Sequence, residues 1–411
     1  MSTASTRLAA ACVAVMTTAA CASGTTTSTD GTSRAAATSS PSTPLSPAPS
    51  ATTGTATMTR DVAMTRPGKL TKPTVSPDLL VYSGNSLPAS TVAGVRKVKG
   101  VTDVNTFSMA TFFHEERQVT YAAVDPATFR RYTPAGSAQT LAVWDRVADG
   151  EMAIDPALGR KLADKSGYVK MGNDDGSPKV HIGAYAGLVK RFGGSSVIDA
   201  VVNEKWAPRL GMKQGNAMLV STGAASPQRI QQKLRKITGK NTSVQIVAVN
   251  VDIHTTQTAV LTGGSVSDAL GTLNYTANRN GTVNPDPAWV SSFIRSESVP
   301  IIGRVTCNKV MLPELRGALS EVVADGLAAS IHPSEYGGCF VPRFIANTQS
   351  LSFHTFGTAI DLNVPGNERG TIGTIDRQVV AIFEKWGFQW GGVWHYTDPM
   401  HFELHQIVRP K

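Results

Sequence analysis

Two short polar segments near the C-terminus constrain the fold of this chain more than any other feature. The first is His354-Thr-Phe-Gly-Thr-Ala-Ile-Asp361, and the second is Asp398-Pro-Met-His401. Two imidazoles and one carboxylate form a ligand set that suits Zn²⁺ and leaves one coordination position for water. We therefore expect the fold to bring His354, Asp361 and His401 together as metal ligands. Asp398 would then take a proton from that water.

The residues around these segments predict two strands that must pair. Residues 359–363 alternate, so a strand there places Asp361 on one face and its apolar neighbours on the other. Residues 400–405 form the second candidate strand, which begins next to His401. Pairing of the two strands would bring the three expected ligands to one point.

The N-terminal sequence predicts export. Arg7 precedes a short apolar run over residues 8–16, which is typical of a signal peptide and too short for a permanent membrane span. Small residues directly before Cys21 resemble the cleavage box of bacterial lipoproteins, although Thr18 stands where an aliphatic residue is usual. We expect residues 1–21 to be a lipoprotein-type signal peptide, with a lipidated Cys21 anchoring the chain to the outer face of the cytoplasmic membrane. Simple secretion is the alternative.

Composition and periodicity divide the rest of the chain. Its 411 residues allow two domains plus disordered segments. Residues 22–77 are rich in Ser, Thr, Ala and Pro and predict a disordered tether. Residues 78–253 alternate short apolar runs with helical patterns and predict an α+β domain, after which the Thr-, Gly- and Asn-rich residues 254–286 predict a linker. The last domain, residues 287–411, carries the two polar segments.

The last domain is predicted to be a small antiparallel sheet with flanking helices, which gives the whole chain an α+β fold. Apolar residues at helical spacing follow Pro313 and recur before Gly387, so two helices are expected there. Their stripes are Leu315, Leu319, Val322, Val323 and Leu327 in the first, and Val379, Ile382, Phe383 and Trp386 in the second. Cys307 and Cys339 are expected to form a disulfide, as cysteine pairs in exported domains usually do, with two buried free thiols as the alternative.

The formal charge of +9 favours contact with an anionic surface. No dense block of Lys and Arg with interleaved aromatic residues occurs in the sequence. A wall polymer or a lipid surface is therefore the expected partner, and nucleic acid is not expected.

The motifs of the last domain resemble a known family. They are Ser352-x-His354-x-x-Gly357-x-Ala359-x-Asp361, the segment containing Trp390 and Trp394, and Asp398-Pro-Met-His401-Phe402-Glu403. In this order they are similar to the VanY/VanX-type D-alanyl-D-alanine peptidases and to the related L-alanyl-D-glutamate endopeptidases of phage lysins. The resemblance implies zinc ligation by His354, Asp361 and His401, with Asp398 as general base. The dipeptidase branch has Glu at the base position, whereas this chain, like the endopeptidase branch, has Asp.

Other residues of this domain have two interpretations each. Arg343 resembles the family's arginine that holds a substrate carboxylate, a task suited to a guanidinium, and a surface ion pair is the alternative. His395 either stabilises the oxyanion of the reaction or lines the cleft. Ser352 either binds substrate or orients the loop of the first ligand. Glu403 and His405 are either partners of the ligands or solvent-exposed.

The middle domain resembles the extracytoplasmic domain of bacterial ABC-type permeases of the MacB/FtsX class. The likeness rests on residues 95–104, 124–129 and 203–208, and it implies an interaction or positioning module with a membrane protein as partner. No cluster of catalytic groups occurs there, because His114-Glu115-Glu116 and Asp174-Asp175 are interpreted as solvated surface.

The expected function is zinc-dependent hydrolysis of peptidoglycan stem peptides by an extracytoplasmic enzyme of the D-alanyl-D-alanine carboxypeptidase type. A wall endopeptidase of the L-alanyl-D-glutamate type is one alternative. A catalytically silent protein that binds the cell wall or a partner is another, although an inactive relative would have no need of Asp398.

Overall fold

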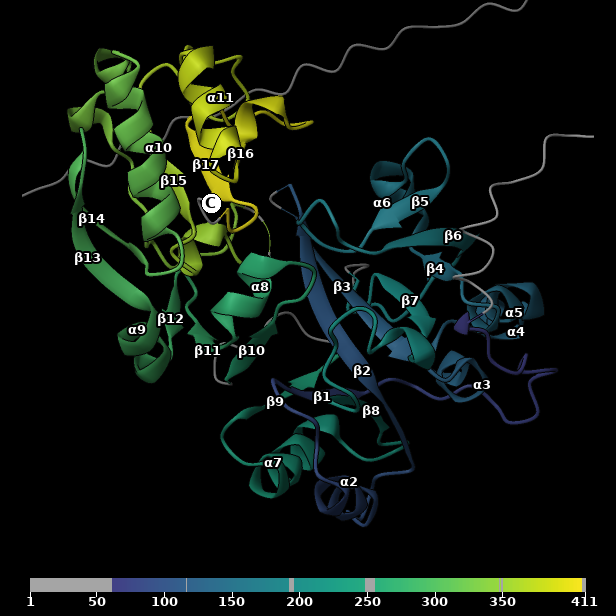
Figure 1. The fold of residues 1–411 in the computed structure, drawn as a ribbon. Helices are drawn as coiled ribbons and strands as arrows, with labels where there is room; N and C mark the ends of the chain where they lie inside the picture. Colours follow the sequence, from purple (N-terminus) through teal and green to yellow (C-terminus); the bar gives the residue numbers. More distant parts are fainter. Residues whose placement is uncertain are drawn as a thin grey trace, which may run out of the picture. The chain divides into compact units, whose positions relative to one another are not determined.

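One large sheet in the middle domain and three small sheets after it carry the described part of the chain, which confirms the α+β expectation (Figure 1). The computed structural model describes residues 61–115, 117–191, 196–247, 256–346, 348 and 350–408, all within one unit, Thr52–Lys411. The expected signal peptide and Cys21 lie outside the described residues. None of the helices in the described part has the length and apolar character needed to cross a membrane.

The middle domain is a nine-stranded sheet in the order β5-β6-β4-β7-β3-β2-β8-β1-β9. Its strands are β1 (Leu79–Ser83), β2 (Asp103–His114), β3 (Arg117–Val124), β4 (Met152–Ile154), β5 (Tyr168–Lys170), β6 (Lys179–Tyr185), β7 (Ala200–Asn203), β8 (Ala217–Ser221) and β9 (Thr242–Ile246). The helices around it are α2 (Ala89–Arg96), α3 (Pro126–Phe129), α4 (Ala135–Gln139), α5 (Leu141–Ala148), α6 (Pro156–Leu162) and α7 (Pro227–Thr238).

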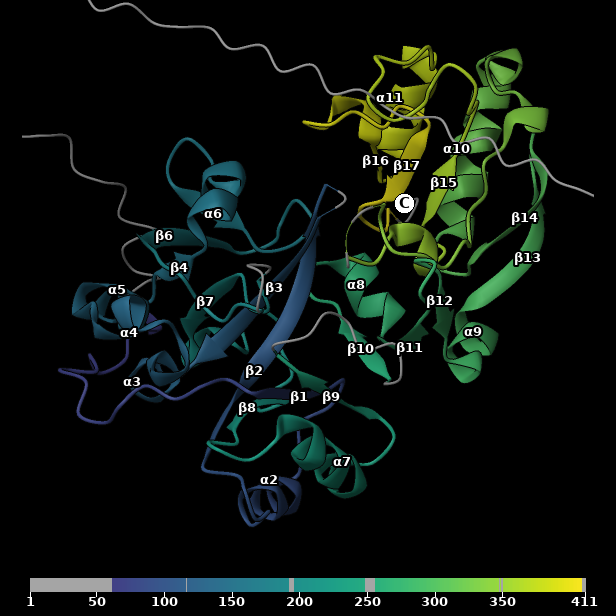
Figure 2. The same cartoon turned by 180° about the vertical axis from the view of Figure 1, so that it is seen from behind.

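Helices α2 and α7 cover one end of this sheet (Figure 2). Ser226 precedes α7 and Pro227 occupies its first turn, as the sequence predicts, although the Ser226 side chain makes no capping hydrogen bond. Ile230 and Leu234 of α7 join the apolar cluster of β1, β8 and β9. Ile237, at the next helical position, is exposed, because it lies beyond the edge of that cluster.

Strand β2 connects the two halves of the described chain. Its first half pairs with β8, and its second half forms a hairpin with β3 that ends in the pair His114↔Arg117. Thr111 near the hairpin end bridges to Leu261, which follows the middle domain in sequence. The β2–β3 hairpin therefore continues past the end of the pairing between β2 and β8.

Part of the expected tether, residues 61–77, is packed in the described structure. Val62 is buried, and its carbonyl accepts a hydrogen bond of 2.7 Å from Nδ2 of Asn203. Arg66 forms an ion pair with Asp149 at 2.7 Å. Residues 61–77 of the expected tether thus lie against the middle domain.

The expected linker, residues 254–286, is largely folded, so that prediction was wrong. It contains β10 (Gln257–Val260), α8 (Ser265–Leu270), β11 (Thr272–Ala277) and β12 (Val283–Pro285), and the three strands pair in the order β10-β11-β12. Leu273, Tyr275 and Ala277 alternate as buried residues along β11. Polar Thr and Asn residues on the opposite face of the strand hide this alternation from a composition-based reading.

The described residues of the last domain form a hairpin, a small sheet and three α-helices, with short 3-10 turns between them. The hairpin pairs β13 (Ile294–Val299) with β14 (Gly303–Asn308), and the sheet has the order β15-β17-β16. Its remaining elements are α9 (Pro287–Phe293), α10 (Leu312–Ala324), β15 (Ala359–Asp361), α11 (Arg377–Lys385), β16 (Phe388–Trp390) and β17 (His401–Leu404). Helices α10 and α11 lie beside this sheet in both views (Figures 1 and 2).

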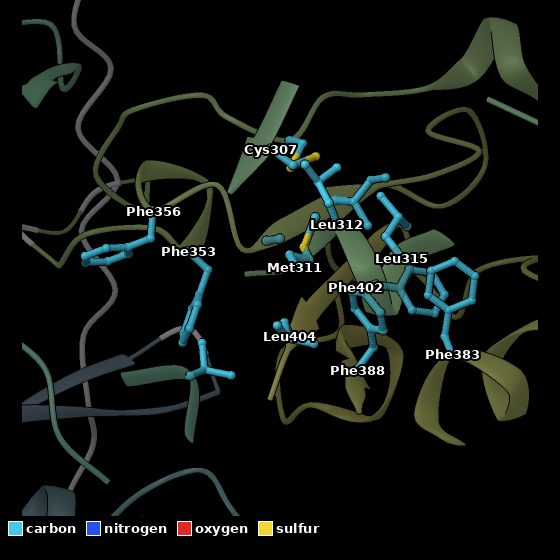
Figure 3. Close-up of a cluster of buried hydrophobic side chains, with 14 of the residues drawn as sticks. Cys307, Met311, Leu312, Leu315, Phe353, Phe356, Phe383, Phe388, Phe402 and Leu404 are labelled. Atoms are coloured by element: carbon cyan, nitrogen blue, oxygen red, sulfur yellow. A yellow bond between two sulfur atoms is a disulfide. The ribbon is translucent and has the colours of Figure 1, made fainter. Parts of the chain in front are cut away.

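The apolar stripes predicted for α10 and α11 face one shared core. Leu315, Leu319 and Val322 of α10 are fully buried, whereas Val323, predicted to belong to the stripe, is 47% exposed. Phe383 of α11 packs against Phe402 of β17 with ring centroids 4.7 Å apart (Figure 3). This packing fixes the strand that carries the second polar segment.

A disulfide joins Cys307 of β14 to Cys339, as predicted. Both cysteines are buried in the core of the last domain, and Figure 3 shows Cys307 beside Met311 and Leu312. The bridge ties the segment after α10 to the hairpin before it.

Replacement of Leu273 by Ala tests whether the expected linker belongs to the folded core. The side chain is fully buried, so Leu273→Ala should lower the free energy of unfolding of the full chain by about 2–5 kcal/mol. The control Thr276→Ala removes a partly exposed side chain of the same strand and should change that free energy by less than about 0.5 kcal/mol. Urea denaturation measures both. Equal values would mean that β11 contributes no core.

Candidate metal centre

The pairing of β15 with β17 brings the two polar segments together. The strands are antiparallel, and Asp361 lies directly opposite His401. Ile360 and Leu362 on either side of Asp361 enter the apolar core, as the predicted alternation requires. The strand is shorter than the predicted one, because it ends at Asp361, and Asn363 beyond it has a left-handed φ of +49°.

A single turn of 3-10 helix, Phe353–Thr355, carries His354 to the start of β15. Gly357 follows it with φ of +66°, and a Cβ there would lie 2.9 Å from the backbone nitrogen of Asn308. That nitrogen donates to the Gly357 carbonyl at 2.8 Å. The close approach and the left-handed backbone explain the glycine, and the resulting bend places His354 against Asp361.

The three expected ligands converge, with their ligand atoms all within 4.8 Å of one another. Nε2 of His354 lies 3.1 Å from Oδ1 of Asp361 and 3.2 Å from Nδ1 of His401. Nδ1 of His401 lies 3.0 Å from the same carboxylate oxygen. A tetrahedral zinc ion with bonds of about 2.0–2.1 Å separates its ligand atoms by about 3.3 Å. The three atoms therefore fit one such ion.

The outer nitrogen of each histidine has a partner that leaves the inner nitrogen available for a metal. Nδ1 of His354 lies 2.9 Å from the carbonyl oxygen of Cys339, and because a carbonyl only accepts, that nitrogen carries the proton. Nε2 of His401 lies 3.5 Å from Oε2 of the buried Glu403. Such outer partners orient ligating imidazoles and raise their basicity.

Burial and charge shift two pKa values at this centre. Burial alone would raise the pKa of Asp361, but the hydrogen bonds from His354 and His401 hold it well below its usual range. Burial would lower the pKa of His401, yet Asp361 and Glu403 raise that pKa to about 10. Without a metal, His401 thus holds a second ring proton at neutral pH, and a metal ion would replace that proton.

Asp398 lies in the tight turn that leads into β17. Its backbone nitrogen donates to the Gly391 carbonyl at 2.9 Å, and its carbonyl accepts from the backbone nitrogen of His401 at 3.0 Å. The residue is 5% exposed. Nε1 of Trp390 donates to the carbonyl of Pro399 at 2.7 Å and so secures the same turn.

Ser352 and Arg343 flank the turn of the first ligand. Oγ of Ser352 accepts from the backbone nitrogen of His354 at 3.3 Å, which is the orienting role of its two interpretations. The backbone nitrogen of Arg343 donates to Oγ1 of Thr355 at 2.9 Å, and that hydroxyl donates back to the Arg343 carbonyl at 2.7 Å. The Arg343 side chain is partly exposed. This side chain therefore extends from a backbone that is held beside the turn carrying His354.

The segment before Asp398 forms a wall of the centre. The Trp394 ring lies 5.3 Å from the His401 ring and is buried. His395 is exposed, and its backbone nitrogen donates to Oε1 of Glu115 in the middle domain at 3.2 Å. Glu115, which was predicted to belong to solvated surface, therefore makes a contact while remaining partly exposed.

His405 does not accompany the ligands. Its pKa is lowered, chiefly by burial and also by the nearby charge of Lys170, a residue of the middle domain. Of the two residues interpreted as ligand partners, only Glu403 contacts a ligand. Asp174, predicted as solvated surface, likewise makes a contact, because its carboxylate accepts from the backbone nitrogen of Ser265 at 2.7 Å.

Tyr336 is a neighbour of the centre that sequence reasoning missed. Burial and the negative charge of Asp361 raise the pKa of its phenol to about 12. The next residue, Gly337, donates its backbone N–H to the Asp361 carbonyl at 2.9 Å. Tyr336 lies outside both polar segments, so no spacing in the sequence marks it.

Comparisons with known proteins bear on both domains. Residues 346–404 match a family model described as D-alanyl-D-alanine carboxypeptidase, and the matched residues include all three expected ligands and Asp398. The C-terminal segment is carboxypeptidase-like. A comparison with curated proteins gives no match.

Among solved structures, the extracellular domain of the noncanonic ABC-type transporter YknZ from Gram-positive bacteria is similar to part of this chain. The identity is 15% and the TM-score 0.24, over 41% of this chain and 98% of that one.

Zinc binding at pH 7 should release about one proton per ion, because His401, whose pKa is raised to about 10, must lose its proton to become a ligand. Since the folded pKa is raised, the release should persist below pH 10 and fade above it. Calorimetric titration of metal-free protein in two buffers of different ionisation enthalpy measures it. Binding without proton release at pH 7 would contradict the assigned environment of His401.

Replacement of Glu403 by Gln should weaken zinc binding by about tenfold, because the carboxylate orients His401 and raises its basicity. The matched control is His405→Gln, two residues further along, where no ligand is contacted, and it should bind zinc like wild type. Competition with a chromogenic chelator measures both affinities. Equal loss in the two variants would show that the effect is not specific to Glu403.

Proposed function

We propose that this chain is a zinc-dependent peptidase that hydrolyses peptidoglycan stem peptides in the manner of a D-alanyl-D-alanine carboxypeptidase. The convergence of His354, Asp361 and His401 carries the proposal, because three ligand atoms 3.0–3.2 Å apart leave a fourth position open. The family match over residues 346–404 supports a carboxypeptidase-like peptidase at this position.

A zinc ion held there would act as a Lewis acid. It would polarise a scissile carbonyl and lower the pKa of bound water to about 7. Asp398 is proposed as the general base that takes the proton of the attacking water and passes it to the leaving amine. The hydrogen bond between the backbones of Asp398 and His401 supports this role, because it fixes the base relative to a ligand.

Arg343 is proposed to hold the terminal carboxylate of the substrate. A guanidinium binds a carboxylate through two parallel hydrogen bonds, and the fixed backbone of Arg343 beside Thr355 limits where its side chain can reach. His395 is proposed to lie at the mouth of the cleft, where its exposed side chain can donate to the oxyanion or line the entrance. These assignments describe an enzyme that acts on a peptide end.

The proposed place of action is the outer face of the cytoplasmic membrane or the cell wall, through the predicted signal peptide and a lipidated Cys21. The disulfide between Cys307 and Cys339 favours an oxidising compartment. The wall peptide is then the substrate within reach, and a membrane protein bound through the middle domain is the proposed partner.

Replacement of Asp398 by Asn should reduce hydrolysis of purified stem peptides at least about 100-fold while zinc binding is retained, because only the general base is lost. The control Asp325→Asn changes an exposed aspartate after α10 and should leave the rate unchanged. Mass spectrometry of the products measures both rates.

The same digest identifies the bond. Loss of one terminal D-Ala agrees with the carboxypeptidase proposal, whereas cleavage after L-Ala would identify the endopeptidase alternative. If wild type with zinc cleaves none of the stem peptides, the enzyme proposal fails and the silent wall-binding protein remains.

A further inference from the structure

The β2–β3 hairpin of the middle domain is built into the core of the last domain. Phe113, near the hairpin end, is 5% exposed and packs its ring 4.5 Å from that of Phe353 and 6.2 Å from that of Phe356. Oε1 of Gln118 accepts from the backbone nitrogen of Leu351 at 3.3 Å. These contacts fix the hairpin against the turn that carries His354.

The tip of the hairpin reaches the other side of the candidate metal centre. Glu115 has φ of +50°, a left-handed conformation that non-glycine residues rarely adopt and that tight hairpin turns require. In this conformation its carboxylate accepts from the backbone nitrogen of His395. One hairpin therefore contacts both segments that flank the ligands.

A cavity of about 1270 Å³ lies between the middle sheet and this wall of the metal centre. From the last domain it is lined by Arg369, Trp394, His395 and Tyr396, among others. Trp394 also packs against the ring of His401, so the cavity begins one side chain away from a ligand. Its volume exceeds the range of about 300–1,000 Å³ that is usual for small-molecule sites, and it suits an extended peptide.

The charged lining of the cavity is unbalanced toward basic side chains. The basic residues are Arg117, Arg160, Lys161, Arg191 and Arg369, and the acidic ones are Glu115, Asp155 and Asp199.

The three acidic groups are already engaged in contacts within the protein. Asp155 forms an ion pair with Lys190 at 3.0 Å, and Glu115 accepts from the backbone of His395. Asp199 accepts from the backbone nitrogen of Thr120 at 2.8 Å, and burial raises the pKa of its carboxyl. The exposed side chains of Arg160 and Lys161 therefore offer positive charge to anionic ligand groups in this cavity.

We propose that this cavity is the binding groove for an acidic peptide, with the middle domain as its outer wall and Arg160 and Lys161 as the residues that attract the peptide's carboxylates. Both side chains are exposed on α6 and line the cavity. The inference rests on the proposed function, since the peptide in question is the part of the stem that extends away from the scissile bond. It assigns substrate selection to a domain that carries no ligand of the metal centre.

The test is a double charge reversal in the full chain, Arg160→Glu with Lys161→Glu. The matched control is Lys233→Glu with Lys236→Glu on α7, which makes the same charge change at exposed positions that do not line the cavity. For a stem peptide with free carboxylates, KM should rise about tenfold in the first variant, with kcat unchanged. The control should keep the wild-type KM.

Two further measurements identify the cause. The rise in KM should shrink for a peptide whose carboxylates are amidated, and it should shrink at high salt, because screening weakens attraction between exposed charges. Equal KM values for the two double variants on the acidic peptide would overturn the groove while leaving the peptidase proposal intact.

If wild type cleaves no stem peptide, the proposed function fails first, and binding decides the groove separately. Calorimetry with the acidic peptide should then show weaker binding to the Arg160→Glu, Lys161→Glu variant than to wild type. Equal affinities, or no binding to either protein, would overturn the groove.

Discussion

The antiparallel pairing of β15 with β17 is the interaction on which the candidate site depends. It sets Asp361 opposite His401 and so joins two segments that lie far apart in sequence. A shift of one residue in this register would turn the ligand side chains to the opposite face of the sheet. The aromatic packing of Phe402 against Phe383 holds the register, because the residue next to His401 is anchored in the apolar core.

The sequence predicted the convergence of His354, Asp361 and His401 because its spacing and its strand alternation indicate the same geometry. Asp361 and His401 lie in strands, where a period of two separates polar from apolar residues, and that period is visible in residues 359–363. The disulfide could also be predicted, since only two cysteines remain after the expected signal peptide. The observed strand ends at Asp361, short of the predicted residue 363, and its pairing with β17 still places Asp361 opposite His401.

Composition did not predict the elements and contacts that depend on tertiary packing. The segment of β11 reads as a linker because Thr and Asn alternate with its buried residues, yet Leu273 completes a core that residues far away in sequence supply. Glu115 reads as solvated surface because its contact with His395 joins residues 280 positions apart. For the same reason the sequence did not mark Tyr336 and did not show that Glu403, but not His405, contacts a candidate ligand. Neighbours that only the tertiary fold brings together leave no periodic signal.

The cystine between Cys307 and Cys339 has a consequence for the position of His354. The carbonyl of Cys339 is the acceptor that orients the His354 imidazole, so one half of the cystine holds a ligand in its binding tautomer. The disulfide ties Cys339, which supplies that carbonyl, to Cys307 of β14. In a reduced chain the segment around Cys339 would lack this covalent link. The disulfide thereby helps to hold the His354 imidazole in place, and its reduction would loosen that position.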